Sequence, residues 1–271
     1  MISVGSAQDC GGVSDVAPAD DGTLYYVMNL GADPAIREGM PAELQDAGWL
    51  MKVAPGGTPE RVADVAAFET ANDPDAAEGG EVDSNPYALA ITDSSIAIAD
   101  AGGNDVLHVA DDGTVSLIAS IPFTMHEYSA EELAAMGGPA EGGAPDEAMP
   151  AGPEMVPVPV QAVPTSVTVS PEGALYVGQL TGGPFPVGGA SVWRVADGED
   201  PTENATGFTN IMGLGFAPDG TLYVAELVHE GLMGVFAGGQ PPIGAVMSVA
   251  PPGVASPRWW PRASSSWPWV A

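Results

Sequence analysis

Polar side chains with oxygen donors recur along this chain in two repeated settings. One set follows a short segment of alternating apolar residues: Asn29, Asp100, Gln179 and Glu226. The other set precedes a similar segment: Asp15, Asn85, Thr165 and Asn210. Carboxylate and amide oxygens suit a hard cation such as Ca²⁺, and they also hydrogen-bond small ligands. The competing interpretation is that each side chain caps the backbone of its own turn, as short polar side chains commonly do.

Other site chemistries find little support in the sequence. The single cysteine, Cys10, excludes an internal disulfide and a cysteine metal cluster. The acidic run from Asp73 to Asp83 lacks the ligand order of an EF-hand, and no hydrolase, phosphate-loop or dinucleotide motif occurs. No metal-ligand spacing relates the three histidines, His108, His126 and His229. We predict no catalytic residue and no certain cofactor, with Ca²⁺ as the one candidate.

The charge of the chain is strongly negative. It contains 36 Asp and Glu residues against 6 Lys and Arg residues, a formal net charge of −30. This disfavours nucleic acid or an anionic membrane surface as a partner, and indicates either a solvated acidic surface or a cation-binding rim. No apolar run approaches the roughly 18 residues needed to cross a bilayer. The first residues, 1–5, show no export signal, because they lack a basic segment and an apolar one.

The elements that would position these side chains are repeated. Turns of an acidic residue and glycine lead into short alternating segments in three places, ending at Gly22, Gly173 and Gly220, and a fourth such segment begins at Ser95. Glycine permits the positive φ of a tight turn, and the alternation predicts a strand with one buried face. Each turn also follows another alternating run, such as Val167–Val169 or Leu214–Phe216, so each unit opens with a β-hairpin.

A second signature follows each hairpin and predicts two further strands. It reads Val-Ala followed by a turn with glycine, beginning at Val53, Val109, Val195 and Val249. Four antiparallel strands per unit are typical of β-propeller blades, and the shortest period, 47 residues between Gly173 and Gly220, lies within the range of known blade repeats. We predict an all-β propeller with blades at about 13–65, 84–121, 163–208 and 211–256.

Two longer excursions interrupt the predicted blades. The segment at about 122–161 is rich in Pro, Gly, Glu and Met. Within it, Ser129-Ala130-Glu131-Glu132 predicts the capping box of a short helix that stops near Gly137. A second short helix is expected between Asp33 and Trp49, inside the first blade.

Several motifs resemble the ScyD/ScyE family of scytonemin-biosynthesis-associated propeller proteins. They include Ser84-Asn85-Pro86-Tyr87, Ala99-Asp100-Ala101-Gly102-Gly103-Asn104 and Tyr176-Val177-Gly178-Gln179, and the resemblance covers roughly residues 13–250. It implies an NHL-like propeller of six blades, located outside the cytoplasm, with no established catalytic activity. About four of those blades would then be present in this sequence.

The two ends depart from the family pattern. The family has a further hairpin before the first one of this chain. Residues 257–271 change character to Trp, Pro and Arg. We interpret residues 1–256 as an incomplete propeller and 257–271 as a tail read in a shifted frame.

The sequence thus favours a non-catalytic binding or scaffold propeller whose partner is an unidentified protein or small molecule. The expected ligand-binding positions, at a mouth of the central channel, are Asp15, Asn85, Thr165, Gln179, Asn210 and Glu226. The alternative is a calcium-dependent hydrolase that resembles gluconolactonase and strictosidine-synthase-like propellers, which hold a divalent cation in the channel. Asp15, Asn85, Asn210 and Glu226 would then bind the metal. Convergence of three of these four on one point would favour the hydrolase, and scattered turn-capping side chains would favour the binding protein.

Overall fold

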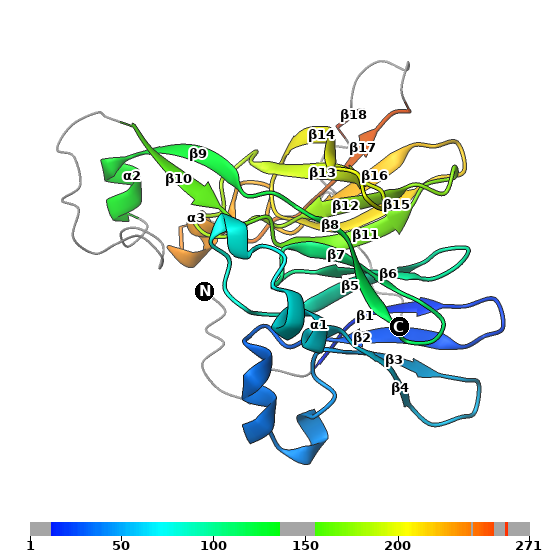
Figure 1. Ribbon diagram of the computed structural model, residues 1–271. Helices are drawn as coiled ribbons and strands as arrows, with labels where there is room; N and C mark the ends of the chain where they lie inside the picture. The colour runs from blue at the N-terminus through cyan, green and yellow to red at the C-terminus, as the bar shows by residue number, and fades with distance from the viewer. Residues whose placement is uncertain (1–11, 136–154, 240, 252–257, 260–271) are drawn as a thin grey trace, which may run out of the picture.

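Four antiparallel sheets of four strands follow one another along the chain, arranged as the blades of a propeller (Figure 1). The computed structural model describes residues 12–135, 155–239, 241–251 and 258–259. In each sheet the strand order is the chain order. The predicted fold class, an all-β propeller, is confirmed, with four four-stranded blades among the described residues.

The strand bounds of the blades are as follows. Blade 1 contains β1 (Val13–Pro18), β2 (Leu24–Met28), β3 (Trp49–Val53) and β4 (Glu60–Asp64). Blade 2 contains β5 (Pro86–Ile91), β6 (Ile96–Asp100), β7 (Asp105–Val109) and β8 (Val115–Ser120). Blade 3 contains β11 (Pro164–Val169), β12 (Leu175–Gln179), β13 (Ala190–Val195) and β14 (Thr202–Phe208). Blade 4 contains β15 (Ile211–Phe216), β16 (Leu222–Glu226), β17 (Ala245–Val249) and β18 (Arg258–Trp259).

Asp-Gly-Thr turns close several of the hairpins. Asp21 Oδ1 accepts a hydrogen bond from the amide of Thr23 at 2.8 Å, and Gly22 between them has a φ of 84°. The same contact joins Asp219 to Thr221 in blade 4. These bonds lower the pKa of both aspartates, because they stabilise the ionised form. The hydrogen bond from aspartate and the positive φ of glycine fix the shape of each turn, and the turn sets the register of its hairpin.

Apolar clusters hold neighbouring blades together. One joins blades 1 and 2, one joins blades 2 and 3, and one joins blades 3 and 4, where Tyr176 and Phe216 meet edge to face at 5.0 Å. Hydroxyl groups add bonds between blades. Ser14 Oγ donates to the carbonyl of Pro86 at 2.8 Å, and Thr165 Oγ1 donates to that of Ile211 at 2.5 Å.

The two ends of the propeller differ. At one end, short turns connect the strands within each blade. At the other end, which we call the loop face, the first strand of each blade begins and the longer connections run. They carry η1 (Pro34–Gly39), η2 (Ala42–Leu44), α1 (Val65–Asn72), η3 (Ala76–Glu78), β9 (Thr124–Ser129), α2 (Ala130–Ala135), β10 (Met155–Val160) and α3 (Leu232–Phe236). Figure 1 shows α1, α2, α3 and the β9–β10 hairpin on the left of the blades, and the tight turns on the right.

The two excursions contain more structure than the sequence predicted. The first-blade excursion forms η1 and η2, which are 3-10 helices. In the second, the amide of Ser129 donates to Glu132 Oε2 and the amide of Glu132 donates to Ser129 Oγ, which is the predicted capping box. The hairpin of β9 and β10 was not predicted, and Gly137, the expected helix stop, lies outside the described residues. No helix in the described part of the chain is long and apolar enough to cross a membrane.

Candidate functional site

The end of the second strand of each blade places one recurring side chain on the loop face. Asp100, Gln179 and Glu226 pair across the hairpin with the first residue of their blade's first strand, and all three are buried. In blade 1 that register position belongs to Met28, which pairs with Val13. The sequence predicted Asn29 at the position of Asp100, Gln179 and Glu226, and this prediction was wrong by one residue.

Asp100 holds the short loop between β6 and β7, on the loop face, and the start of blade 2. Its Oδ2 accepts from Ser84 Oγ at 2.6 Å, and its Oδ1 accepts from the amides of Asn85, Gly102 and Gly103 at 2.5, 3.0 and 3.2 Å. These are the contacts of a turn-capping residue. Complete burial nevertheless raises the pKa of Asp100, because desolvation outweighs the hydrogen bonds.

Gln179 and Glu226 are also held by their surroundings. Trp193 Nε1 donates to Gln179 Oε1, whereas Gln179 Nε2 is buried with no acceptor among the described residues. Glu226 Oε1 accepts from the amide of Thr209 at 2.6 Å, and its Oε2 lies 2.5 Å from His229 Nδ1. The same register position therefore anchors a connection in blades 2 and 4.

Only two of the four residues expected before the first strands occupy equivalent positions. The carbonyls of Asn85 and Asn210 accept from the amides of Ala101 and Leu227, both at 2.9 Å. Gly12 and Val163 make the same backbone bond in blades 1 and 3. The amide oxygens of three asparagines on the loop face are buried without a donor among the described residues: Asn29, Asn85 and Asn210.

Asp15 and Thr165 lie within the first strands, and their expected equivalence to Asn85 was wrong. Asp15 Oδ2 accepts from the amide of Leu89 in the next blade at 2.9 Å, and Oδ1 accepts from the amide of Val16 at 2.8 Å. Thr165 likewise bonds to the next blade through Ile211. Both side chains fasten one blade to another. A β-bulge interrupts the pairing at the same place in all four first strands, so the register is the same in each blade, and the positions equivalent to Asn85 are Gly12 and Val163.

Sequence reasoning missed a cluster of buried and half-buried carboxyl groups at the loop-face end of blade 2. Its members come from α1, from the connection between blades 1 and 2, and from β6 and β7: Glu69, Asp75, Asp83, Asp100 and Asp105. Glu69 and Asp75 are 1% exposed and Asp105 is 0% exposed. A Cβ on Gly103 would lie 2.6 Å from Cδ of Glu69, so the glycine makes room for the glutamate.

The cluster retains protons near neutral pH. Burial, together with Asp100, raises the pKa of Glu69 to about 8. Burial and the adjacent Glu69 raise the pKa of Asp105 well above its usual range. Burial and Asp100 raise the pKa of Asp83 to about 7. The group can therefore bind or release protons within the physiological range.

Asn104 connects this cluster to blade 3. Its Nδ2 donates to Asp75 Oδ2 at 2.8 Å, and its Oδ1 accepts from the amide of Val163 at 2.9 Å. Within the described residues, no group of three or more His, Cys, Asp or Glu side chains is arranged to hold a metal ion. The chemistry that the geometry supports is proton binding and rigid support of the connections.

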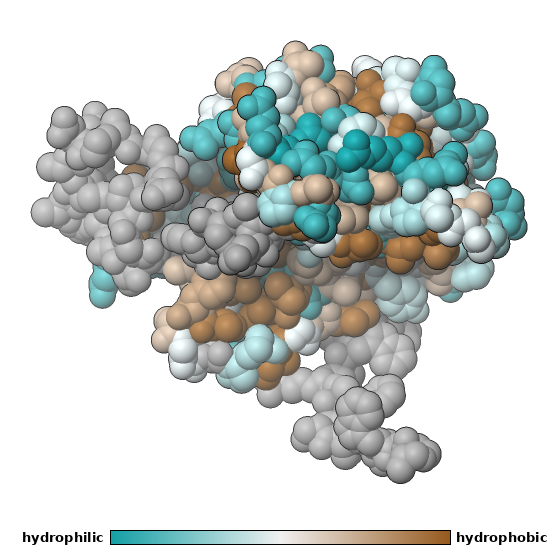
Figure 2. Space-filling view, turned by 90° about the horizontal axis from the view of Figure 1, so that it is seen from below, coloured by the Kyte–Doolittle hydropathy of each residue, from teal (hydrophilic) through white to brown (hydrophobic). Residues whose placement is uncertain are grey.

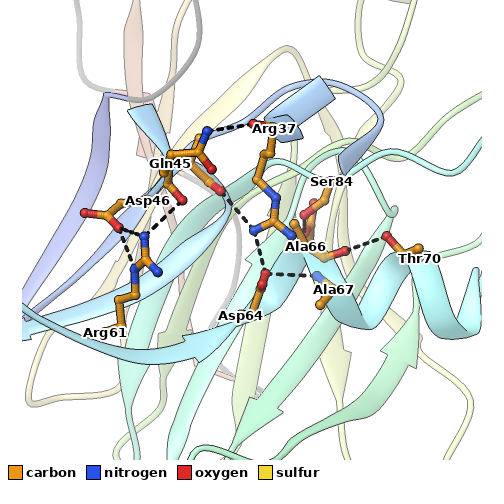
Figure 3. A network of polar contacts seen from close by, with 11 residues as sticks. Arg37, Gln45, Asp46, Arg61, Asp64, Ala66, Ala67, Thr70 and Ser84 are labelled. Atoms are coloured by element: carbon orange, nitrogen blue, oxygen red, sulfur yellow. Dashed lines mark hydrogen bonds and ion pairs between the residues drawn. The ribbon is translucent and has the colours of Figure 1, made fainter. Parts of the chain in front are cut away.

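Blade 1 uses its arginines to hold its own insertion (Figure 3). Arg37 contacts Asp64 at 2.8 Å, and Arg61 contacts Asp46 at 2.6 Å. Asp64 also accepts from the amide of Ala67 and so caps α1. These pairs fix η1, η2 and α1 against blade 1 and neutralise positive charge on the loop face.

A cavity of about 490 Å³ lies at the opposite end of the molecule, between blades 2 and 3. Its lining includes His108, Glu172 and Arg194. None of the recurring polar residues of the loop face contributes to it.

Comparison with known proteins does not identify a family. No family model and no curated protein matches the chain. A chain of a nidogen/laminin complex has 10% identity, with 81% of this chain and 58% of that chain covered and a TM-score of 0.45. Virginiamycin B lyase from Staphylococcus aureus has 11% identity, with 93% and 71% covered and a TM-score of 0.41. A gluconolactonase from Xanthomonas campestris has 14% identity, with 78% and 53% covered and a TM-score of 0.42. This chain thus spans little more than half of the nidogen/laminin chain and of the gluconolactonase. These similarities do not indicate a function.

Proposed function

We propose that this β-propeller is a non-catalytic binding or scaffold protein of the ScyD/ScyE type that acts outside the cytoplasm and binds its partner on the loop face. The observation that carries the proposal is the use made of the recurring polar side chains. Asp15, Asp100, Thr165 and Glu226 hydrogen-bond to backbone groups of turns or neighbouring blades. They support a surface and are not free to act on a substrate.

The connections of the loop face are long enough to form that surface. Binding residues are commonly carried by loops that a rigid scaffold positions. Here buried polar contacts anchor the ends of the connections. Asp100 holds the start of blade 2, and Glu226 holds the start of blade 4. Because their bases are fixed, the loops lose little conformational entropy when a partner binds.

Charge indicates the chemistry of the partner. Exposed carboxylates occur on several insertions of the loop face, including Glu38, Glu43, Glu81 and Glu230. Arg37 and Arg61 are already paired with Asp64 and Asp46. The face is therefore acidic, and it suits a basic protein segment or another cationic ligand. Nucleic acid and anionic membranes would be repelled.

Binding of an oligolysine peptide tests this proposal. One variant carries Glu38→Gln, Glu43→Gln and Glu81→Gln on the loop face. A matched control carries Glu172→Gln, Glu199→Gln and Asp111→Asn among the tight turns. Three exposed ion pairs at about 0.5 kcal/mol each predict a loss of about tenfold in affinity for the loop-face variant. Equal losses in both variants would show that only net charge matters and would contradict the proposal.

A calcium-dependent hydrolase is the second candidate, favoured by the donor-free amide oxygens of Asn85 and Asn210. The expected metal set does not fit as a whole. Asp15 bonds to blade 2, and Glu226 bonds to Thr209 and His229. We therefore expect Ca²⁺, Mg²⁺ and Na⁺ at matched ionic strength to raise the melting temperature equally, through screening. A rise specific to Ca²⁺ that Asn210→Ala abolishes would favour the metal site instead.

A further inference from the structure

The cavity between blades 2 and 3 lies at the tight-turn end of the molecule, away from the loop face. Its volume of about 490 Å³ falls within the range of roughly 300 to 1,000 Å³ that is typical of small-molecule pockets. Blade 1 packs on blade 2 and blade 4 packs on blade 3, so both walls of the cavity belong to blades with a neighbour on either side. In the view from below, hydrophilic residues dominate the right-hand margin, where the tight turns lie (Figure 2). A cavity lined by apolar residues therefore differs from its surroundings at this end.

Small residues at the junction of blades 2 and 3 replace an aromatic pair. Between blades 3 and 4, Tyr176 on β12 and Phe216 on β15 meet edge to face at 5.0 Å. By strand pairing, the equivalent residues between blades 2 and 3 are Ala97 and Val169. Blade 1 also has a tyrosine, Tyr25, at the position of Ala97. Two small side chains thus stand where the next junction has two rings, which leaves space at the tight-turn end.

The inner lining of the cavity is apolar. It includes side chains from both blades: Ile118, Val169, Leu175 and Val195. His108 lies beside them, and it pairs with Ala97 across β6 and β7. Since Ala97 packs in the cluster that joins blades 2 and 3, the His108 ring is also on the face of blade 2 that is turned toward blade 3. Aliphatic side chains and an imidazole ring together suit an aromatic group.

The rim of the cavity is negatively charged. Three exposed carboxylates line it from the turns: Asp93, Glu172 and Asp197. None of the three forms an ion pair within the described part of the chain. Arg194 also contributes to the lining, but its neighbour Val195 packs toward blade 2, so strand alternation places the Arg194 side chain on the opposite face, with Tyr176. The carboxylates therefore set the charge that a bound ligand meets.

From this arrangement we infer that the cavity binds a small aromatic amine. Its ring packs against the apolar lining and His108, and its ammonium group lies among the carboxylates of the rim. The net charge of −30 attracts cations and raises their concentration near the surface. An aromatic acid of the same size is repelled by the rim. This site lies at the opposite end from the loop face and does not depend on the function proposed for that face.

Phenethylamine is the probe that tests this inference, because 2-phenylethanol and phenylacetate carry the same ring on a neutral and on an anionic group. In NMR titrations at physiological ionic strength, phenethylamine should shift the ring signals of His108 saturably. The ring signals of His229, on the loop face, should stay in place. We expect 2-phenylethanol to bind several-fold more weakly than phenethylamine, and phenylacetate not to bind.

Substitutions separate the space of the cavity from its charge. Val169→Phe introduces an aromatic residue of the kind found at the next junction and should abolish binding by filling the cavity. Asp93→Asn combined with Asp197→Asn should weaken binding about fivefold, the loss expected for two exposed ion pairs. The matched control combines Asp20→Asn with Asp111→Asn, which removes the same charge from exposed turn residues outside the cavity and should leave the affinity unchanged.

Four outcomes would overturn the inference. They are unchanged His108 signals with phenethylamine, equal binding of phenylacetate, equal losses in the two charge variants, and full binding by a folded Val169→Phe variant. If Val169→Phe does not unfold cooperatively, the two charge variants decide the question, because their altered side chains are exposed and their fold should survive.

Discussion

Replacement of Glu69 by Gln should stabilise the protein at neutral and mildly alkaline pH. Glu69 is buried against Asp105, and its pKa is raised to about 8 in the folded chain. An unfolded glutamate has a pKa of about 4.3, so between these values the folded chain keeps a proton that the unfolded chain releases. Stability is therefore greatest below the unfolded pKa and falls as the pH rises toward 8. The substitution Glu69→Gln removes this dependence, because the new amide does not titrate and can donate to Asp105.

The size of the effect follows from proton linkage. One proton released on unfolding costs about 1.4 kcal/mol of stability per pH unit. Between about pH 5.5 and 7.5, the difference in unfolding free energy between Glu69→Gln and the unaltered chain should grow by roughly 2 to 3 kcal/mol in favour of the variant. For a chain of this size, that corresponds to a relative gain of roughly 4 to 12 °C in melting temperature.

Urea unfolding at several pH values measures this slope directly. Glu172→Gln removes the same charge from an exposed position among the tight turns and should leave the pH dependence unchanged. Parallel pH profiles for Glu69→Gln and the unaltered chain would refute the reasoning, because Glu69 would then be ionised in the folded protein.

Three further substitutions test the contacts that support the loop face. Thr165→Val removes the hydroxyl that bonds to Ile211 in blade 4 and should cost about 1 kcal/mol in urea unfolding; no change would mean that the bond between blades adds nothing. Trp193→Phe leaves Gln179 without its donor and should cost about 1 to 3 kcal/mol, together with the lost ring contacts; a neutral result would show that Gln179 is free to bind elsewhere. Gly103→Ala forces a methyl group against the Glu69 carboxyl and should lower stability by about 1 to 3 kcal/mol, and unchanged thermal unfolding would contradict the tight packing of the cluster.

The sequence predicted the fold well because the relevant signals are local. An acidic residue and glycine in a turn, followed by alternating apolar residues, identify three of the four hairpins, and the turn contacts of Asp21 and Asp219 show why. The β9–β10 hairpin was missed because Pro157 and Pro159 argue against a strand. Both prolines lie on β10, which pairs only with β9 among the described strands, so no second neighbour there requires their missing amides.

The site was harder to predict because its geometry depends on the exact strand register and on long-range packing. Asp15 lies three residues beyond Gly12, which is the position equivalent to Asn85, and Asn29 lies one residue beyond the position that Met28 occupies. The carboxyl cluster joins Glu69 on a connecting helix to Asp105 on β7, and no short motif relates these residues. Their proximity arises only when α1 packs over blade 2.

Hydrogen exchange with and without the oligolysine peptide tests the central claim most directly. If the loop face is the binding surface, the peptide should slow exchange in the connections at residues 29–48, 65–85, 180–189 and 227–239, and should leave the tight turns at 92–95, 110–114 and 170–174 unchanged. Protection of those tight turns with no change on the loop face would contradict the account.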